Sequence, residues 1–482
     1  MPTMPKLQNA YIFLNKHSDL IALICLCIGI FCYGIGLGKL AKNFQAQSFI
    51  LIGGVIFVIF NFKKFGKDDL KILAIPLICI GILLFLALLT YFDSTLPPKS
   101  FSALVKTINS NLLGYFVFFV ICFLFCRYAK RQFAYIPLYC FAFMCVINVV
   151  AMVFLALQNG FYHESFKQNV PFFFRSITQY NVWIPLPLAV SLAGIFVYKQ
   201  MKLRLLFVCC LVASIIAILA NGERSFFLAF GVMIFIPFLI YRYSYKKYIL
   251  VALALISAVA FYAILHFSKD LPPRYNAHNI ISNLGIVWHT TPIEMGKYDK
   301  LCFESKWLEC TEESLRERSD ISIEHSTLSR LNMTKSTLLA FLDSPLMPRV
   351  PDVLQTGEYI YKYYQQHNPQ NGSYIKSMQR GKRGTMLYYN HTHNFIAGLL
   401  LCYGIVGFGA IIVSMCYLLF IAYKATRTAD LRVNLVGLSA IIFFVGLCVN
   451  ISFDALLTMM LQTIFILLGF ITGFLTRSDN AR

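Results

Sequence analysis

Long uninterrupted runs of apolar residues are the feature that most restricts what this chain can fold into. A typical run is Leu70–Phe92, in which Lys71 is the only charged residue. A helix of about 20 apolar residues crosses a bilayer, because a helix satisfies its own backbone hydrogen bonds where no water is present. Only 13% of the residues are charged, against about 25% in an average soluble domain. The chain is therefore predicted to be a polytopic membrane protein.

The apolar runs predict an all-α fold with about twelve transmembrane helices. They lie near 20–38, 46–62, 70–91, 111–126, 133–157, 179–198, 204–220, 225–241, 248–266, 394–423, 434–451 and 455–475. No cleavage site follows the first run, so we expect it to remain as an anchor. The run at 394–423 is longer than one straight span requires, which indicates a tilted or broken helix. We expect nine spans within 1–266, a loop domain over 267–392, and three spans within 393–482.

The net charge of +20 first suggests a nucleic-acid partner, but the positions of the charges exclude one. With the N-terminus placed in the cytoplasm, the cytoplasmic segments hold 20 of the 42 Lys and Arg residues and only 5 of the 22 Asp and Glu residues. Basic clusters such as Lys63-Lys64 and Arg127–Arg131 recur after every second span, which is the positive-inside pattern. This pattern, with an even number of spans, predicts that both termini are cytoplasmic and that the long loop lies on the opposite side. We expect a bacterial inner-membrane protein, in which that side is the periplasm.

The loop at 267–392 is too long to be a simple connection. Apolar residues three and four positions apart predict a helix near 322–343. We therefore expect a mainly helical cap on the periplasmic face of the membrane. Cys302 and Cys310 are the only cysteines outside the apolar runs. In an oxidising compartment they are able to form a disulfide, and the sequence leaves open whether they do.

The motifs of common soluble enzymes are missing from the chain, among them the Walker loop, the dinucleotide fingerprint, the zinc-type Cys/His cluster and the nucleophile elbow. Few acidic residues lie deep in the spans, which disfavours an ion-coupled transporter. Polar and charged residues remain at the outer ends of spans and in the loop, notably Arg224, Arg330 and His393-Asn394.

Each of these residues has an ordinary interpretation beside a functional one. Arg224 is able to snorkel to lipid head groups, and Arg330 to lie on a solvated helix face. His393 is able to cap a helix, or to share a metal with His391. It is also suited to act as a general base, because histidine titrates near neutral pH.

Taken together, these segments resemble the O-antigen ligase and polymerase superfamily in order, spacing and topology. Arg330 followed by Leu331, and the later Ser344-Pro345-Leu346 turn, resemble the helix and turn of the family's loop. His393-Asn394 with a Gly-x-x-Gly at Gly404–Gly407 resembles the start of the helix that follows that loop. The resemblance covers about 170–475.

Two positions depart from the family pattern. Glu223 stands before Arg224 where a serine is common, and Met347-Pro348-Arg349 replaces a frequent Gly-x-Gly. These departures weaken the match of the turn that contains Glu223 and Arg224, and of the segment after Ser344-Pro345-Leu346. The His393-Asn394 element matches closely.

The resemblance implies a membrane glycosyltransferase that needs no cofactor and no metal ion. It would move an O-antigen glycan from undecaprenyl diphosphate to a sugar of the lipid A core, with inversion at the anomeric carbon. Arg224 and Arg330 would bind the diphosphate, because guanidinium groups bind phosphate bidentately, and His393 would be the general base. Weaker candidates for substrate contacts, which otherwise bind membrane lipids, are Arg175, Arg274, Asn394, Lys382 and Arg383.

Three other functions remain open at this point. An O-antigen polymerase would use the same donor, and a protein oligosaccharyltransferase is a further member of the superfamily. A polytopic lipid or solute transporter would also have twelve spans. The acceptor, the sugars and the oligomeric state are not readable from the chain.

Overall fold

The computed structural model describes residues 4–37, 39–41, 44–92, 100–159, 182–221, 224–241, 246–268, 276–293, 325–367, 392–453, 456 and 458–477. These residues are almost entirely helical, and the one strand pair among them is a short antiparallel hairpin of β1 (Lys39–Ala41) and β2 (Phe44–Gln45). The predicted all-α class is therefore confirmed for the described part of the chain.

The helices follow the apolar runs of the sequence. Their bounds are α1 Met4–Gly34, α2 Ala46–Asn61, α3 Lys67–Leu89, α4 Phe101–Ile108, α5 Gly114–Tyr128, α6 Arg131–Ala134, α7 Ile136–Asn159, α8 Pro185–Val197, α9 Met201–Asn221, α10 Arg224–Ile240, α11 Lys246–Phe267, α12 Ala277–His289, α15 His325–Leu342, α16 Thr356–His367, α18 Phe395–Ala425, α19 Leu431–Ile451 and α20 Thr458–Leu475. Short turns of other helix types include the π-helical η3 (Asn109–Leu113) and the 3-10 helix η8 (Val353–Gln355).

Within the described residues, nine helices are long and apolar enough to cross a membrane. They are Ile12–Gly34, Ala46–Lys64, Lys67–Phe92, Phe101–Tyr128, Arg131–Phe154, Met201–Ala220, Phe395–Ala425, Leu431–Ile451 and Thr458–Leu475. Three shorter apolar helices, Pro185–Val197, Ser225–Ile240 and Lys247–Val259, lie where the sixth, eighth and ninth spans are predicted. A membrane-spanning helical protein is thus confirmed, while the total of twelve spans stays a prediction.

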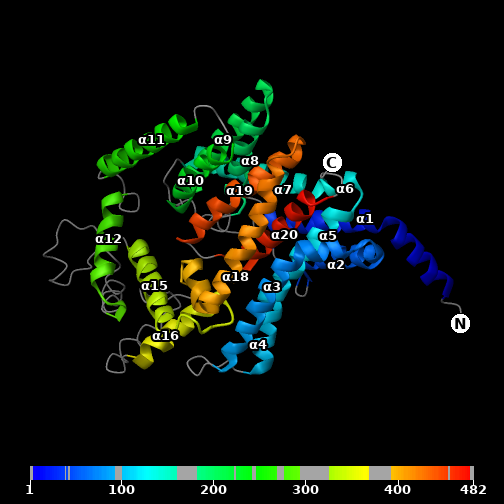
Figure 1. Cartoon of the computed structure of the whole chain (residues 1–482), viewed down its shortest axis with the longest axis horizontal. Coiled ribbons are helices and arrows are strands. Elements are labelled where there is room, and N and C mark those ends of the chain that lie inside the picture. The colour runs from blue at the N-terminus through cyan, green and yellow to red at the C-terminus, as the bar shows by residue number, and fades with distance from the viewer. Residues whose placement is uncertain are drawn as a thin grey trace.

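The bundle is held together by close packing of helices that are distant in sequence. Figure 1 shows α20 lying along α5, and these two helices form an extensive contact. Gly469 and Gly473 of α20 face the Phe119 and Phe123 carbonyl oxygens of α5, which lie 2.4 and 2.3 Å from where a glycine Cβ would be. Small residues four apart allow two helix backbones to approach in this way, which is a common basis of helix association in membranes.

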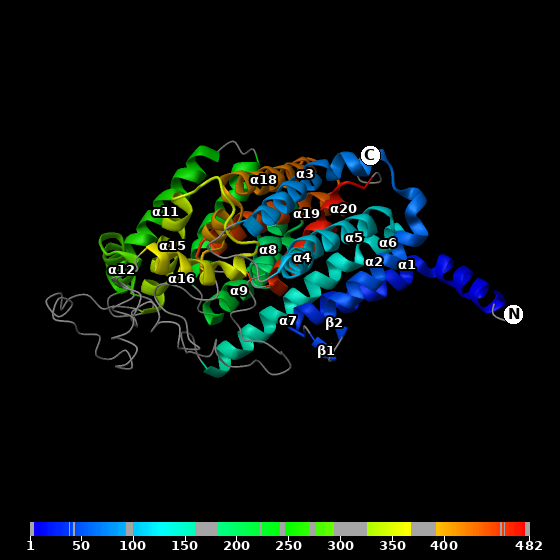
Figure 2. The same cartoon turned by 90° about the horizontal axis from the view of Figure 1, so that it is seen from below.

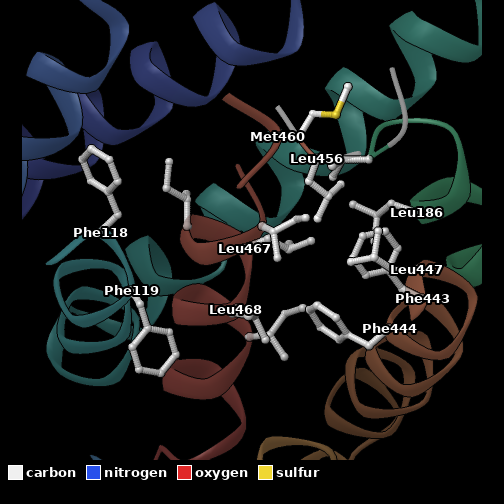
Figure 3. Packing of buried hydrophobic residues seen from close by; sticks show 14 of the residues in the cluster. Phe118, Phe119, Leu186, Phe443, Phe444, Leu447, Leu456, Met460, Leu467 and Leu468 are labelled. Atoms are coloured by element: carbon white, nitrogen blue, oxygen red, sulfur yellow. The ribbon is translucent and has the colours of Figure 1, made fainter. Parts of the chain in front are cut away.

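Aromatic and branched side chains fill the space between these helices and their neighbours. Figure 3 shows Phe118 of α5, Leu467 of α20 and Phe443 of α19 among a dense group of buried side chains. Phe443 is fully buried and Phe118 and Leu467 nearly so. Leu401 and Cys402 of α18 belong to the same buried cluster, so α18 is packed into this core.

One of the basic residues at the ends of the spans forms a structural contact. Arg127 forms an ion pair with Asp69 of α3 at 2.7 Å, and only 12% and 4% of the two side chains are exposed. The Tyr128 hydroxyl and the Gly66 backbone N–H donate to the second oxygen of the same carboxylate, at 2.5 and 2.8 Å. The carboxylate is fully engaged, so this pair joins α3 to α5 at the ends of these two spans.

The helices α12, α15 and α16 gather at one end of the molecule, opposite the end formed by α1 and α2, with α18 between the two groups (Figures 1 and 2). All three belong to the 267–392 segment, and α15 packs against both α12 and α18. The helix predicted near 322–343 is confirmed as α15. The division of the chain into three parts at 266 and 393 stays a prediction.

Candidate active site

The helix α18 is broken at Gly404, whose φ of 62° and ψ of −174° are not helical. The break divides α18 into a short part before Gly404 and a long apolar part after it. The Ile405 N–H donates to the Pro345 carbonyl oxygen at 2.8 Å, and the Arg349 N–H donates to the Leu401 carbonyl oxygen at 3.1 Å. The turn at Ser344–Leu346 is therefore inserted at the break and replaces helix hydrogen bonds that the break removes. A broken helix was expected here from the length of the apolar run, and it is confirmed.

Only glycine fits at the centre of this junction. A Cβ on Gly404 would lie 2.9 Å from the Pro345 oxygen and 3.0 Å from the Leu346 oxygen. Both are backbone atoms that cannot turn away, and the backbone conformation itself is one that residues with side chains rarely adopt. Gly404 thus couples the turn that follows α15 to the helix that follows His393.

His393 lies immediately before the first turn of α18 and is half-buried. Its φ of 48° is the only positive φ of a non-glycine residue in the described part of the chain. The residues on both sides are fixed: the Asn394 side chain caps α18 by accepting from the Ala397 N–H at 3.0 Å, and the buried Thr392 hydroxyl donates to the Asn394 carbonyl oxygen at 2.7 Å. Strained backbone of this kind is concentrated at functional sites.

The capping role therefore belongs to Asn394 and not to His393. Asn394 was a weak candidate for substrate binding, and its amide oxygen is engaged by the helix backbone. Its amide nitrogen remains a candidate for a substrate contact, which stays a prediction.

A half-buried carboxylate joins two elements beside this position, and its neighbour Val353 contacts a third. Asp352 caps η8, accepting from the Leu354 N–H at 3.2 Å, and its other oxygen accepts from the Asn111 amide of η3 at 2.6 Å. Val353, the first residue of η8, lies 2.7 Å from where a Cβ on Gly398 of α18 would be. Loss of water around Asp352 raises the pKa of its carboxyl above the usual range, although the Leu354 N–H and the Asn111 amide partly oppose this.

Sequence reasoning did not find the pairing of Asp352 with Asn111. An Asp just before a short helix is a recognisable N-cap signal, so the cap itself could have been predicted. The partner 241 residues away could not, because no pattern in the sequence relates the two segments.

Arg330 lies on α15 and is half-buried. The face of α15 that packs inward is mixed, since Asn332, Ser336 and Thr337 are fully buried beside apolar residues such as Leu328 and Ala340. By contrast, Leu342 near the end of the helix is 62% exposed. The apolar spacing predicted the helix correctly, but the leucines at its end do not face the protein interior.

Lys335 fixes the position of α15 against α12. Its ammonium group donates to the carbonyl oxygens of Val287, Trp288 and Thr290 at 2.7, 3.1 and 2.8 Å. These carbonyls end α12 and have no partners within that helix, so a cation stabilises them through hydrogen bonds and through the helix dipole. This contact was also not predicted from the sequence.

Several predicted residues lie outside the described part of the chain. They are Arg175, Arg274, Lys382 and Arg383, together with Cys302 and Cys310. Arg224 begins α10, but the position of its side chain is likewise outside the description. The described structure therefore brings together α15, which carries Arg330, and α18, which follows His393, through the junction at Gly404. In the described residues no group of three or more His, Cys, Asp or Glu side chains is arranged to hold a metal ion.

Part of the chain that contains this arrangement is similar to a known protein family. Residues 209–412 match the family model described as O-antigen ligase. The match covers less than half of the chain, and over this part the chain is similar to that family. The match begins in α9 and ends in α18, so it contains Arg224, Arg330, His393 and the Gly404 break. Among the curated proteins, a search finds none that matches the chain.

The apolar helices are those of a membrane protein, and the matched part of the chain is similar to the O-antigen ligase family.

Proposed function

We propose that the chain is a lipopolysaccharide O-antigen ligase of the bacterial inner membrane. In this proposal it transfers the glycan of an undecaprenyl diphosphate donor to a hydroxyl of the lipid A core on the periplasmic side. The observation that carries the proposal is the fixed, strained backbone of His393 at the start of α18. The family match over 209–412 supports it, since that range contains all three residues to which we assign the chemistry.

In the proposed reaction, His393 accepts the proton of the acceptor hydroxyl as its oxygen attacks the anomeric carbon. The bond from that carbon to the diphosphate oxygen breaks on the opposite face, which inverts the configuration. The products are the glycosylated core and undecaprenyl diphosphate. A diphosphate is a good leaving group, so no acid is needed to protonate it.

Negative charge develops on the leaving diphosphate, and we assign its stabilisation to Arg224 and Arg330. General-base assistance contributes a factor of about 10²–10⁴, and preorganised cations contribute as much or more. We therefore expect Arg224→Ala or Arg330→Ala to reduce ligation at least as strongly as His393→Ala.

The test is the lipopolysaccharide profile of a strain that lacks this protein and is complemented with each variant. Loss of a ligase leaves bare lipid A core while polymerised glycan accumulates on its lipid carrier. Loss of a polymerase leaves core with a single repeat, and loss of a transporter gives neither pattern. A lipopolysaccharide profile that stays normal together with loss of glycan from a protein would indicate an oligosaccharyltransferase.

His289→Ala is the matched control, because His289 is an exposed histidine of the same 267–392 segment. It should restore the normal profile, while His393→Ala should not. Full ligation by His393→Ala would show that the base is another group.

A further inference from the structure

An exposed apolar patch lies at the junction of α15 and α18. We call it the tip patch, and its side chains are each at least half exposed: Leu342 62%, Leu346 64%, Met347 52%, Ile405 54% and Val406 50%. The two segments that form it are distant in sequence and are joined by the hydrogen bond from the Ile405 N–H to the Pro345 oxygen. An exposed cluster of large apolar residues marks a surface that contacts a partner or a membrane.

The tip patch is continuous with an apolar stripe along α18. Further exposed residues follow at Ile412, Val413 and Phe420. Steps of seven or eight residues are two helical turns, so these side chains lie on the same face as Ile405 and Val406. Among the candidate spans of the described chain, α18 is the least buried, with 11% of its most apolar window inside the protein. This stripe is therefore the lipid-facing side of α18.

The length of the helix after the break places the tip patch at a membrane boundary. The 20 residues from Ile405 to Lys424 span about 30 Å at 1.5 Å per residue, which equals the thickness of the hydrocarbon core. The far end is marked by Lys424, whose ammonium lies 4.5 Å from the Phe420 ring centroid, and by Arg427. The near end, at Ile405, then coincides with the opposite boundary.

The segment that carries the patch is suited to contact lipid. Between Leu339 and Pro348 the only charged residue is Asp343, and its carboxylate accepts a hydrogen bond from the Tyr363 hydroxyl of α16. Burial, followed by this hydrogen bond to Asp343, raises the pKa of the Tyr363 hydroxyl. Although Ala340 and Phe341 of the same helix are buried, Leu342 at its end is exposed together with Leu346 and Met347 of the following turn, and large apolar side chains exposed in this way are suited to contact lipid.

We infer that the tip patch is immersed among the acyl chains of bilayer lipids, in the leaflet on the side of the 267–392 segment. Leu342, Leu346 and Met347 form a wedge that anchors this segment to the membrane surface beside α18. The anchor sets the height of α15, and with it Arg330, above the plane in which the head groups of lipid-linked molecules lie. The anchor itself does not depend on the proposed glycosyl transfer.

Tryptophan fluorescence in lipid nanodiscs tests this inference. The three native tryptophans are replaced by phenylalanine, and Leu346→Trp provides a single probe. Met347→Trp is a second probe in case the first variant does not fold, and Gln366→Trp, at an exposed position of α16, is the control. Each protein is placed in phosphatidylcholine and in phosphatidylcholine brominated near the head-group end of its acyl chains.

For the probe in the tip patch we expect blue-shifted emission that falls by about half or more in the brominated lipid, because bromine atoms at that depth contact it. The control should emit as in water and be unaffected. Water-like, unquenched emission from both tip probes in folded protein would overturn the inference. Recovery of emission on adding undecaprenyl phosphate would also overturn it, because the patch would then be a site for a polyprenyl chain and not for bulk lipid.

These nanodiscs contain no glycan donor and no acceptor. A negative result would therefore remove the membrane anchor without bearing on the proposed ligase reaction.

Discussion

Replacing Gly404 by alanine tests the coupling between the Ser344–Leu346 turn and α18. The backbone of Gly404 lies in a region that is almost exclusive to glycine, which costs about 1–3 kcal/mol for another residue. The new Cβ would also lie 2.9 and 3.0 Å from two backbone oxygens, and overpacking of this kind costs about 1–3 kcal/mol. If the backbone keeps its native conformation, both costs apply, and Gly404→Ala destabilises the folded protein by about 2–6 kcal/mol.

The chain has one other way to accommodate the alanine, which is to straighten α18. That would break the hydrogen bonds from Ile405 to Pro345 and from Arg349 to Leu401. Each bond contributes about 1 kcal/mol, and more where no water replaces the partner. Both routes therefore cost about 2 kcal/mol or more.

Thermal unfolding of the purified protein in nanodiscs, followed by intrinsic fluorescence, measures this cost. We expect Gly404→Ala to lower the unfolding midpoint by several degrees and to abolish complementation in the lipopolysaccharide assay. Gly409→Ala is the matched control, since Gly409 lies in the same helix with nothing within 4 Å of its added Cβ. Alanine is favoured over glycine in a helix by about 0.8–1 kcal/mol, so its midpoint should stay equal or rise. Equal midpoints for the two variants would refute the reasoning.

Two further predictions concern contacts that the sequence did not reveal. Lys335→Met removes three hydrogen bonds to the end of α12. Hydrogen exchange of the backbone of 277–293 should therefore become faster, while that of α18 does not change. The control Lys362→Met removes only a partly exposed ion pair with Glu358 at 3.6 Å, so it should leave both exchange rates unchanged. Asp352→Asn tests the raised pKa of the half-buried Asp352 carboxyl. A carboxyl whose pKa is raised on folding stabilises the protein at low pH, and this stabilisation is lost as the pH rises through the folded value. The asparagine variant should therefore be more stable relative to the native protein at neutral pH than at acidic pH, and the opposite order in thermal midpoints would contradict the assignment.

The sequence by itself determined where helices form and which of them are apolar enough for a membrane. A bilayer admits few alternatives to a helix, so the apolar runs indicated where helices form, and even the break in α18 could be predicted from a run too long for one span. Three of the predicted spans are nevertheless shorter helices, Pro185–Val197, Ser225–Ile240 and Lys247–Val259. The motif order around Arg330, the Ser344–Leu346 turn and His393 was sufficient to indicate the superfamily. These features are local, and a local pattern is what a sequence displays directly.

The tertiary structure alone decided which residues meet. The hydrogen bond between Ile405 and Pro345 at the Gly404 break and the hydrogen bond from Asn111 to Asp352 join segments that are distant in sequence. Nothing in the residue pattern of one segment indicates the other. It also decided which medium each helix face contacts. The spacing of apolar residues identifies an apolar helix face. Whether that face contacts protein, lipid or water depends on where the neighbouring helices lie. For this reason the spacing of leucines predicted α15, while the exposure of Leu342 became apparent only in the folded chain.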